Sequence, residues 1–204
     1  MEILVYILLI LTSVVGLTFI IERGIALRWR RMLPPEIEAE VTLCQRPEDV
    51  ARLQRVCHEH ESPIGRLLLL ASDHLDWPQA EVEASLETRA RHEVARLERG
   101  LVVLEIIVGI APLLGLVGTI FGMMTVFADV GKAGLADAAN LARGIATILH
   151  ATLIGLLIAI PSLIFWSYYT KKIEMAGVEM ESLCDEFIRR QYRGANVEDH
   201  KAGN

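Results

Sequence analysis

Residues 101–127 read LVVLEIIVGIAPLLGLVGTIFGMMTVF, and Glu105 is their single charged side chain. Two further apolar runs stand on either side of this stretch, at residues 3–21 and 141–169. A helix of about 20 apolar residues can cross the hydrocarbon core of a bilayer, which is about 30 Å thick. The three runs therefore predict three transmembrane helices, of which the second and third are long enough to tilt or to extend beyond the bilayer.

The composition also fits a membrane protein. Of the 204 residues, 52% are hydrophobic and 23% are charged, so the apolar side chains are gathered in blocks. The net charge is -6 and no basic face is present, which argues against binding to nucleic acid. The three cysteines lack CxxC spacing, and the neighbours in Cys57-His58-Glu59-His60 would point in different directions on a helix, so neither a metal nor another cofactor is expected.

The basic side chains near the apolar runs predict how the chain is oriented. Arginines follow the first run and precede the second, and two lysines follow the third, whereas the connection between the second and third runs has only Lys132. The positive-inside rule then puts the N-terminus outside and the C-terminus in the cytoplasm. No basic n-region precedes the first run and no small-residue cleavage site follows it, so we expect an uncleaved anchor.

The polar parts of the chain predict helices and no strand, so the expected fold is all-α. Prolines divide residues 23–78 into short helices, whereas residues 79–99 have an amphipathic pattern that runs into the second span past Gly100. We expect one long helix there, and another that continues from the third span to Arg193. The predicted segments are a first span at 1–22, a cytoplasmic helical region at 23–100, a second span at 101–128, a periplasmic loop at 129–140, a third span at 141–170, a cytoplasmic helix at 171–193 and a disordered tail at 194–204.

Small residues recur at helical spacing in the second and third spans. Small side chains allow two helix backbones to approach closely, which by itself indicates helix packing and no particular function. A proline within the third span is expected to kink it. The predicted packing residues are Ala111, Pro112, Gly115, Gly118, Gly122, Gly155 and Pro161.

Two long motifs carry a resemblance to a known family. Residues 111–123, APLLGLVGTIFGM, and 144–161, GIATILHATLIGLLIAIP, resemble the second- and third-helix signatures of the ExbB/TolQ/MotA family of proton-driven motor subunits. The pair Glu22-Arg23 and the stretch 97–101 match as well. Three spans with an outside N-terminus resemble the ExbB/TolQ branch, because MotA-type chains have four spans.

The resemblance implies a motor complex in the bacterial inner membrane. It implies a homopentameric ring around two copies of a single-span partner of the ExbD/TolR type, whose membrane aspartate takes up and releases protons. The ring positions that match those facing the aspartate are Thr119 and Thr152. A hydroxyl suits both protonation states, because it donates to a carboxylate and accepts from a carboxylic acid. The motifs identify neither the load that is driven nor the coupling ion, which is sodium in some relatives.

Two positions depart from the family pattern. Many ExbB-type chains have a glutamate where this chain has Thr147, and His150 lies about 60° away on the same side of the helix. The imidazole could replace that carboxylate as a proton-exchanging group, or it could be a neutral hydrogen-bonding side chain. Glu105 could line a proton exit, pair with a neighbouring subunit, or reach to the membrane interface.

Three alternative functions are weighed against the motor subunit. A non-conducting membrane scaffold would need only the small residues, although both threonines at the family positions argue against it. A membrane enzyme would need a catalytic set, and His150 and Glu105 lie at different depths without a nucleophile, so no enzyme is expected. A passive ion channel would conduct without the single-span partner.

Overall fold

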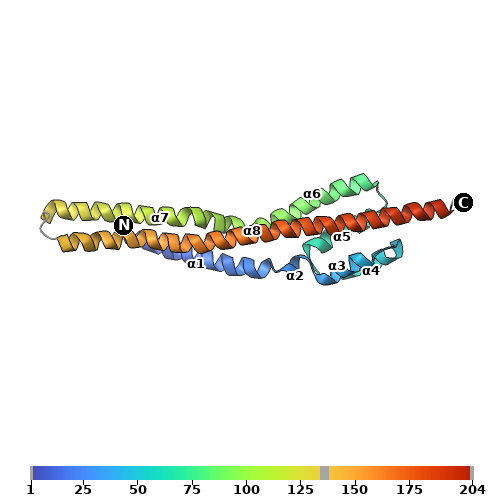
Figure 1. Ribbon diagram of the computed structural model, residues 1–204, viewed down its shortest axis with the longest axis horizontal. Coiled ribbons are helices and arrows are strands. Elements are labelled where there is room, and N and C mark those ends of the chain that lie inside the picture. The colour runs from blue at the N-terminus through green and yellow to red at the C-terminus, as the bar shows by residue number, and fades with distance from the viewer. Residues whose placement is uncertain (1, 134–137, 203–204) are drawn as a thin grey trace. The chain divides into compact units, whose positions relative to one another are not determined.

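The computed structural model describes residues 2–133 and 138–202, and in these residues the chain is helical and has no strand. The all-α prediction is therefore confirmed. The elements are α1 (Glu2–Ala26), α2 (Trp29–Met32), α3 (Pro35–Leu43), the 3-10 helix η1 (Pro47–Asp49), α4 (Val50–Glu59), α5 (Pro63–Asp73), α6 (Gln79–Glu98), α7 (Leu101–Ala133) and α8 (Ala138–Ala202), as Figure 1 shows.

Three of these helices are long and apolar enough to cross a membrane, as the sequence predicts. The apolar stretches are Ile3–Ala26 in α1, Leu101–Ala128 in α7 and Gly144–Arg193 in α8. Many of their large apolar side chains face outward, which suits contact with lipid or with other transmembrane helices. Helices α7 and α8 reach into the predicted loop at 129–140, of which residues 134–137 lie outside the described part.

The chain forms two compact units, and α8 contributes to both. Unit 1 consists of Met1–Gly24 and Gly100–Tyr169, and unit 2 consists of Ile25–Arg99 and Thr170–Asn204. In unit 1, α1, α7 and the first part of α8 run side by side (Figure 1). Their small shared core contains Ile107 and Ala111 of α7 with Ala159 of α8.

Several helices of unit 2 begin where the sequence has prolines. Pro35 and Pro63 stand in the first turns of α3 and α5, where a missing N–H costs nothing. Ser62 caps α5, because its hydroxyl accepts a hydrogen bond of 3.1 Å from the backbone N–H of Gly65. The predicted breaks are thus confirmed. The fully buried side chains of unit 2 include Ile37, Val41, Leu53, Ile64, Leu67, Leu68, Ile173, Ala176, Met180 and Phe187.

The expected continuous helix from residue 79 into the second span is wrong, because α6 ends at Glu98 and α7 begins at Leu101. Within unit 1, Gly100 is buried under the side chain of Arg23, and a Cβ atom on Gly100 would lie 2.2 Å from the Arg23 Nε. Glycine is a poor helix former, and here its missing side chain leaves room for a guanidinium on the backbone. The other expected long helix is α8, which continues from the third span past Arg193. It extends to Ala202, so most of the stretch that the sequence predicts as a disordered tail is helical.

Candidate functional site

Glycines allow α7 and α8 to approach each other closely. A Cβ atom on Gly155 of α8 would lie 2.5 Å from the carbonyl oxygen of Ala111 on α7. A Cβ atom on Gly115 would lie 2.8 Å both from the carbonyl oxygen of Ala151 and from the Cα of Thr152. Only a hydrogen fits at these two positions, so the two backbones touch there.

The same contact continues along α7 and includes α1. A Cβ atom on Gly118 would lie 2.8 Å from the Ala151 Cβ and 3.2 Å from a methyl group of Val5 on α1. One turn further, a Cβ atom on Gly122 would lie 2.5 Å from Ile148. Ala111 is fully buried, Pro112 is half-buried and Pro161 is exposed. Six of the seven predicted packing residues therefore face or flank this three-helix contact, and Pro161 lies on the surface of α8.

Thr152 and Thr119 stand at the edges of the α7–α8 contact. Both side chains are half-buried, and the Thr152 backbone forms part of the wall against Gly115. The Thr119 hydroxyl donates a hydrogen bond of 2.6 Å to the carbonyl oxygen of Leu116, so its own oxygen remains available to accept. The Thr152 hydroxyl has no partner among the described residues and is available both to donate and to accept.

His150 lies away from this contact. It precedes the buried Ala151 by one residue, which turns its side chain by about 100° around α8, and it is exposed. Its Nδ1 lies 2.7 Å from the carbonyl oxygen of Ala146. Because a carbonyl oxygen only accepts, Nδ1 is the donor in this hydrogen bond, and in the neutral ring Nε2 then carries the lone pair. The side chain of Thr147 lies outside the described part of the structure.

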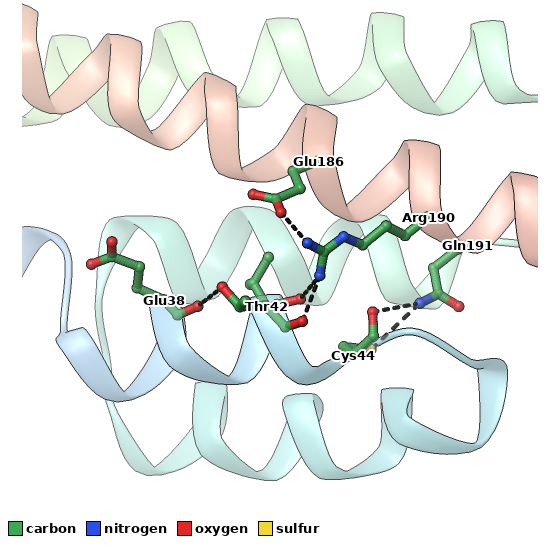
Figure 2. Close-up of polar contacts among 7 residues, drawn as sticks. Glu38, Thr42, Cys44, Glu186, Arg190 and Gln191 are labelled. Atoms are coloured by element: carbon green, nitrogen blue, oxygen red, sulfur yellow. Dashed lines mark hydrogen bonds and ion pairs between the residues drawn. The ribbon is translucent and has the colours of Figure 1, made fainter.

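Unit 2 contains polar contacts that the sequence does not single out. Figure 2 shows Arg190 of α8 at the C-terminal end of α3, where its Nη1 donates to the carbonyl oxygens of Val41 (3.2 Å) and Thr42 (2.6 Å). The same guanidinium pairs with Glu186 one turn earlier on α8. A cation is favourable at a helix C-terminus, which carries unpaired carbonyls and partial negative charge. In the sequence, only the i,i+4 spacing of Glu186 and Arg190 gives a sign of this group of contacts, and it indicates the ion pair alone.

A bidentate ion pair in unit 2 joins α5 to α6. The Arg66 guanidinium binds both carboxylate oxygens of Glu93, at 3.0 Å and 2.5 Å, and the Glu93 side chain is buried. Burial acts to raise the pKa of Glu93, but the hydrogen bonds and charge of Arg66, with the charges of Arg89 and Arg96, hold that pKa below its usual range. The carboxylate therefore stays ionised at neutral pH.

The cysteines of unit 2 are buried and their thiols are poorly ionised. Burial raises the pKa of Cys57 to about 12. Burial, with the charges of Asp49 and Glu40, raises that of Cys44 to about 11. A thiol of such high pKa is a weak nucleophile and a weak metal ligand at neutral pH.

Comparison with known proteins gives consistent matches. The family described as the MotA/TolQ/ExbB proton channel family matches residues 59–182, from the C-terminal end of α4 into α8. The chain is 35% identical over 162 residues, 76% of its length, to the putative biopolymer transport protein ExbB-like 1 of Synechocystis. It is 38% identical over 79 residues (39% of the chain) to the biopolymer transport protein ExbB of Helicobacter pylori. It is 32% identical over 129 residues (60% of the chain) to the Tol-Pal system protein TolQ of Pseudomonas aeruginosa. The matches span 63%, 54% and 56% of these three relatives' own lengths, respectively.

Proposed function

Because this chain belongs to the MotA/TolQ/ExbB proton channel family, we propose that it is the ring-forming subunit of a proton-driven motor complex of the bacterial inner membrane. Its similarity to proteins named ExbB and TolQ, together with its three apolar helices, supports the ExbB/TolQ branch. The observation that carries the proposal is the pair of hydroxyls, Thr119 and Thr152, at the edges of a tight glycine contact between α7 and α8.

In the proposed complex, five copies of this chain surround the helices of two copies of a single-span ExbD/TolR-like partner. A membrane aspartate of that partner exchanges protons beside Thr119, Thr147 and Thr152. The Thr152 hydroxyl, which has no partner among the described residues, can donate to the carboxylate or accept from the protonated acid. One charge that crosses 100 mV gains about 2.3 kcal/mol, so a few protons can supply work on the cell envelope.

The proposed topology has the N-terminus in the periplasm and unit 2 in the cytoplasm. Arg23, which covers the start of α7, belongs to the basic cluster after the first span, and Lys171 and Lys172 follow the third. The positive-inside rule assigns both clusters to the cytoplasm. The loop between α7 and α8 then faces the periplasm and is too short to bind a load, so load recognition is assigned to the partner.

The test is voltage-driven proton uptake into proteoliposomes that contain this chain with its single-span partner. Wild type is compared with Thr119→Val and Thr152→Val, and Thr125→Val is the matched control, because Thr125 lies on α7 and bonds its own helix at the Phe121 carbonyl. We expect uptake that needs the partner, a loss in the first two variants and no loss in the control. Partner-independent uptake would identify a passive channel, and an intact complex without uptake would identify a scaffold.

The same assay decides the role of His150. The exposed position of His150 supports the imidazole as a proton-exchanging group that replaces the glutamate of many relatives at position 147. Loss of uptake in His150→Phe, with retention at low pH in His150→Glu, would support this role. Unchanged uptake in His150→Phe would leave the histidine with only its hydrogen bond to Ala146.

A further inference from the structure

Glu105 has no explanation in the packing of unit 1. It is the only charged residue within Leu101–Ala128, it is exposed, and it makes no hydrogen bond or ion pair with the described residues. Its neighbours Val102 and Ile106 are each 51% exposed, so the carboxylate lies on an apolar surface. An ionisable side chain on such a surface is costly within a membrane and is found where water or another polar group reaches it.

The position of Glu105 on α7 relates it to Thr119. Glu105, Pro112 and Thr119 are spaced by seven residues, and seven residues return a helix to the same side with a drift of about 20°. The three residues therefore lie along one side of α7, and Glu105 is about 21 Å from Thr119 along the helix axis. The buried face that contains Ala111 and Gly118 is a different side of the helix.

Polar backbone groups lie between these two side chains. Pro112 stands inside α7 and has no N–H, so the carbonyl oxygen of Val108 lacks its usual partner four residues ahead. The Leu116 carbonyl oxygen accepts the Thr119 hydroxyl proton and keeps a second lone pair. We name Glu105, Val108, Pro112, Leu116 and Thr119 the Glu105 stripe; each member follows the last by three or four residues. The stripe offers acceptors for water at several levels of an otherwise apolar face.

We propose that the Glu105 stripe is hydrated and that Glu105 receives the protons that leave the site at Thr119 and passes them to the solvent at the start of α7. The inference rests on the proposed function, because the partner's carboxylic acid supplies the proton. Each step breaks one O–H bond and forms another: the acid protonates the nearest stripe water, the proton passes from water to water along the stripe, the last water protonates the Glu105 carboxylate, and Glu105 releases the proton to bulk water.

The charged groups around the start of α7 are compatible with release of the proton from Glu105 at this end. The ionisable side chains of the packed helices at this end of unit 1 are Glu22 and Arg23 of α1 and Tyr168 and Tyr169 of α8. Arg23 binds Glu22 through two hydrogen bonds, of 2.6 Å and 2.9 Å, and lies over Gly100. The Tyr169 hydroxyl donates its hydrogen bond to the carbonyl oxygen of Ile20. Among the described residues none of these groups forms an ion pair with Glu105, so its carboxylate can accept a proton.

The first experiment compares proton uptake in four versions of the partner-bound complex. We expect Glu105→Gln to lower uptake by about tenfold or more, since the amide cannot take up a proton, and Glu105→Asp to retain most of it. The exchange variant Glu105→Ile/Ile106→Glu keeps the charge at the same depth but moves it by about 100° around α7. A relay on the stripe predicts that the exchange variant fails as Glu105→Gln does. A carboxylate that merely reaches to the interface predicts that it works.

The outcomes separate this inference from the proposed function. Absence of uptake in wild type overturns the motor function, and the relay with it. Partner-dependent uptake that is lost in Thr119→Val but unchanged in Glu105→Gln overturns the relay alone.

A second experiment tests hydration of the stripe without proton uptake. Leu116→Cys lies on the stripe and Val117→Cys lies one residue further around α7, and both positions are exposed. A charged thiol reagent reacts with thiolates in water, so in membranes containing the complex we expect Leu116→Cys to react about tenfold faster or more. The three native cysteines are buried and can remain. Equal rates would overturn the hydrated stripe.

Discussion

The hydroxyl of Tyr169 on α8 donates a hydrogen bond of 2.8 Å to the backbone carbonyl of Ile20 on α1, 149 positions earlier in the sequence. The tyrosine is buried, and Gly24 makes room for it, because a Cβ atom there would lie 2.9 Å from the hydroxyl oxygen. One hydrogen bond and one glycine thus join the ends of the first and third apolar helices of unit 1.

This relationship predicts coupling between the two positions. Tyr169→Phe should lower stability by about 1 kcal/mol through loss of the hydrogen bond. Gly24→Ala should also destabilise the protein, because the alanine methyl pushes the hydroxyl away. The double variant should be more stable than the sum of the two losses predicts, since phenylalanine has no hydroxyl to displace. Thermal unfolding of the four proteins in detergent measures the coupling, and strictly additive losses would contradict the contact.

Substitution by alanine should affect stability differently at different glycines of α7 and α8. Gly155→Ala would place a methyl group 2.5 Å from a backbone oxygen of Ala111, which cannot move as a side chain can. We expect a loss of about 1–3 kcal/mol, typical of overpacking. Gly109→Ala is the matched control, because nothing lies within 4 Å of its added Cβ, and the better helix former should be neutral or stabilising by up to about 1 kcal/mol. Equal melting temperatures for the two variants would contradict the close approach of the two backbones.

The sequence predicts the helices well because apolar length and proline position are local signals. The three apolar runs coincide with α1, α7 and α8, and Pro35 and Pro63 begin helices as expected. The break between α6 and α7 could not be predicted, because it accompanies a contact between Arg23 and Gly100, which are far apart in the chain. Pattern reasoning treats a single glycine as tolerable within a helix, and only the packed structure shows what lies on it.

The sequence predicts less of the candidate site than of the helices. The small-residue spacing indicates which faces of α7 and α8 can meet, but only the structure pairs Gly155 with Ala111 and Gly115 with Thr152. The family motif, and not the spacing, singles out Thr119 and Thr152. Long-range polar contacts such as that of Arg190 with the end of α3 leave almost no trace in the sequence, because a carbonyl acceptor belongs to every residue.

Arg190 should matter more to unit 2 than the adjacent Arg189. Arg190→Lys keeps the charge but loses the planar fork that reaches two carbonyls and Glu186, so we expect a loss of about 1–2 kcal/mol. Arg189→Lys is the control, because Arg189 is exposed and only pairs with Asp185 at 3.3 Å, which contributes about 0.5 kcal/mol or less. The buried Cys44, next to this contact, reports local opening through its rate of thiol labelling. Equal labelling rates in both variants would contradict a role for Arg190 in holding α3.

The ion pair between the buried Glu93 and the half-buried Arg66 predicts how unit 2 responds to acid. Because the pKa of Glu93 is held below the ordinary value of 4.5, the pair contributes its full stabilisation above that value. This contribution is lost as the pH falls from 4.5 through the lower pKa of the folded state, where the carboxylate becomes protonated while Arg66 stays charged. Glu93→Gln should lower the melting temperature at pH 7 and flatten its dependence on pH below 4.5. Glu87→Gln, which alters only an exposed pair with Arg91, should leave that dependence as in wild type. Parallel acid profiles for wild type and Glu93→Gln, measured in detergent between pH 7 and pH 3, would contradict an ionised Glu93 in the folded protein.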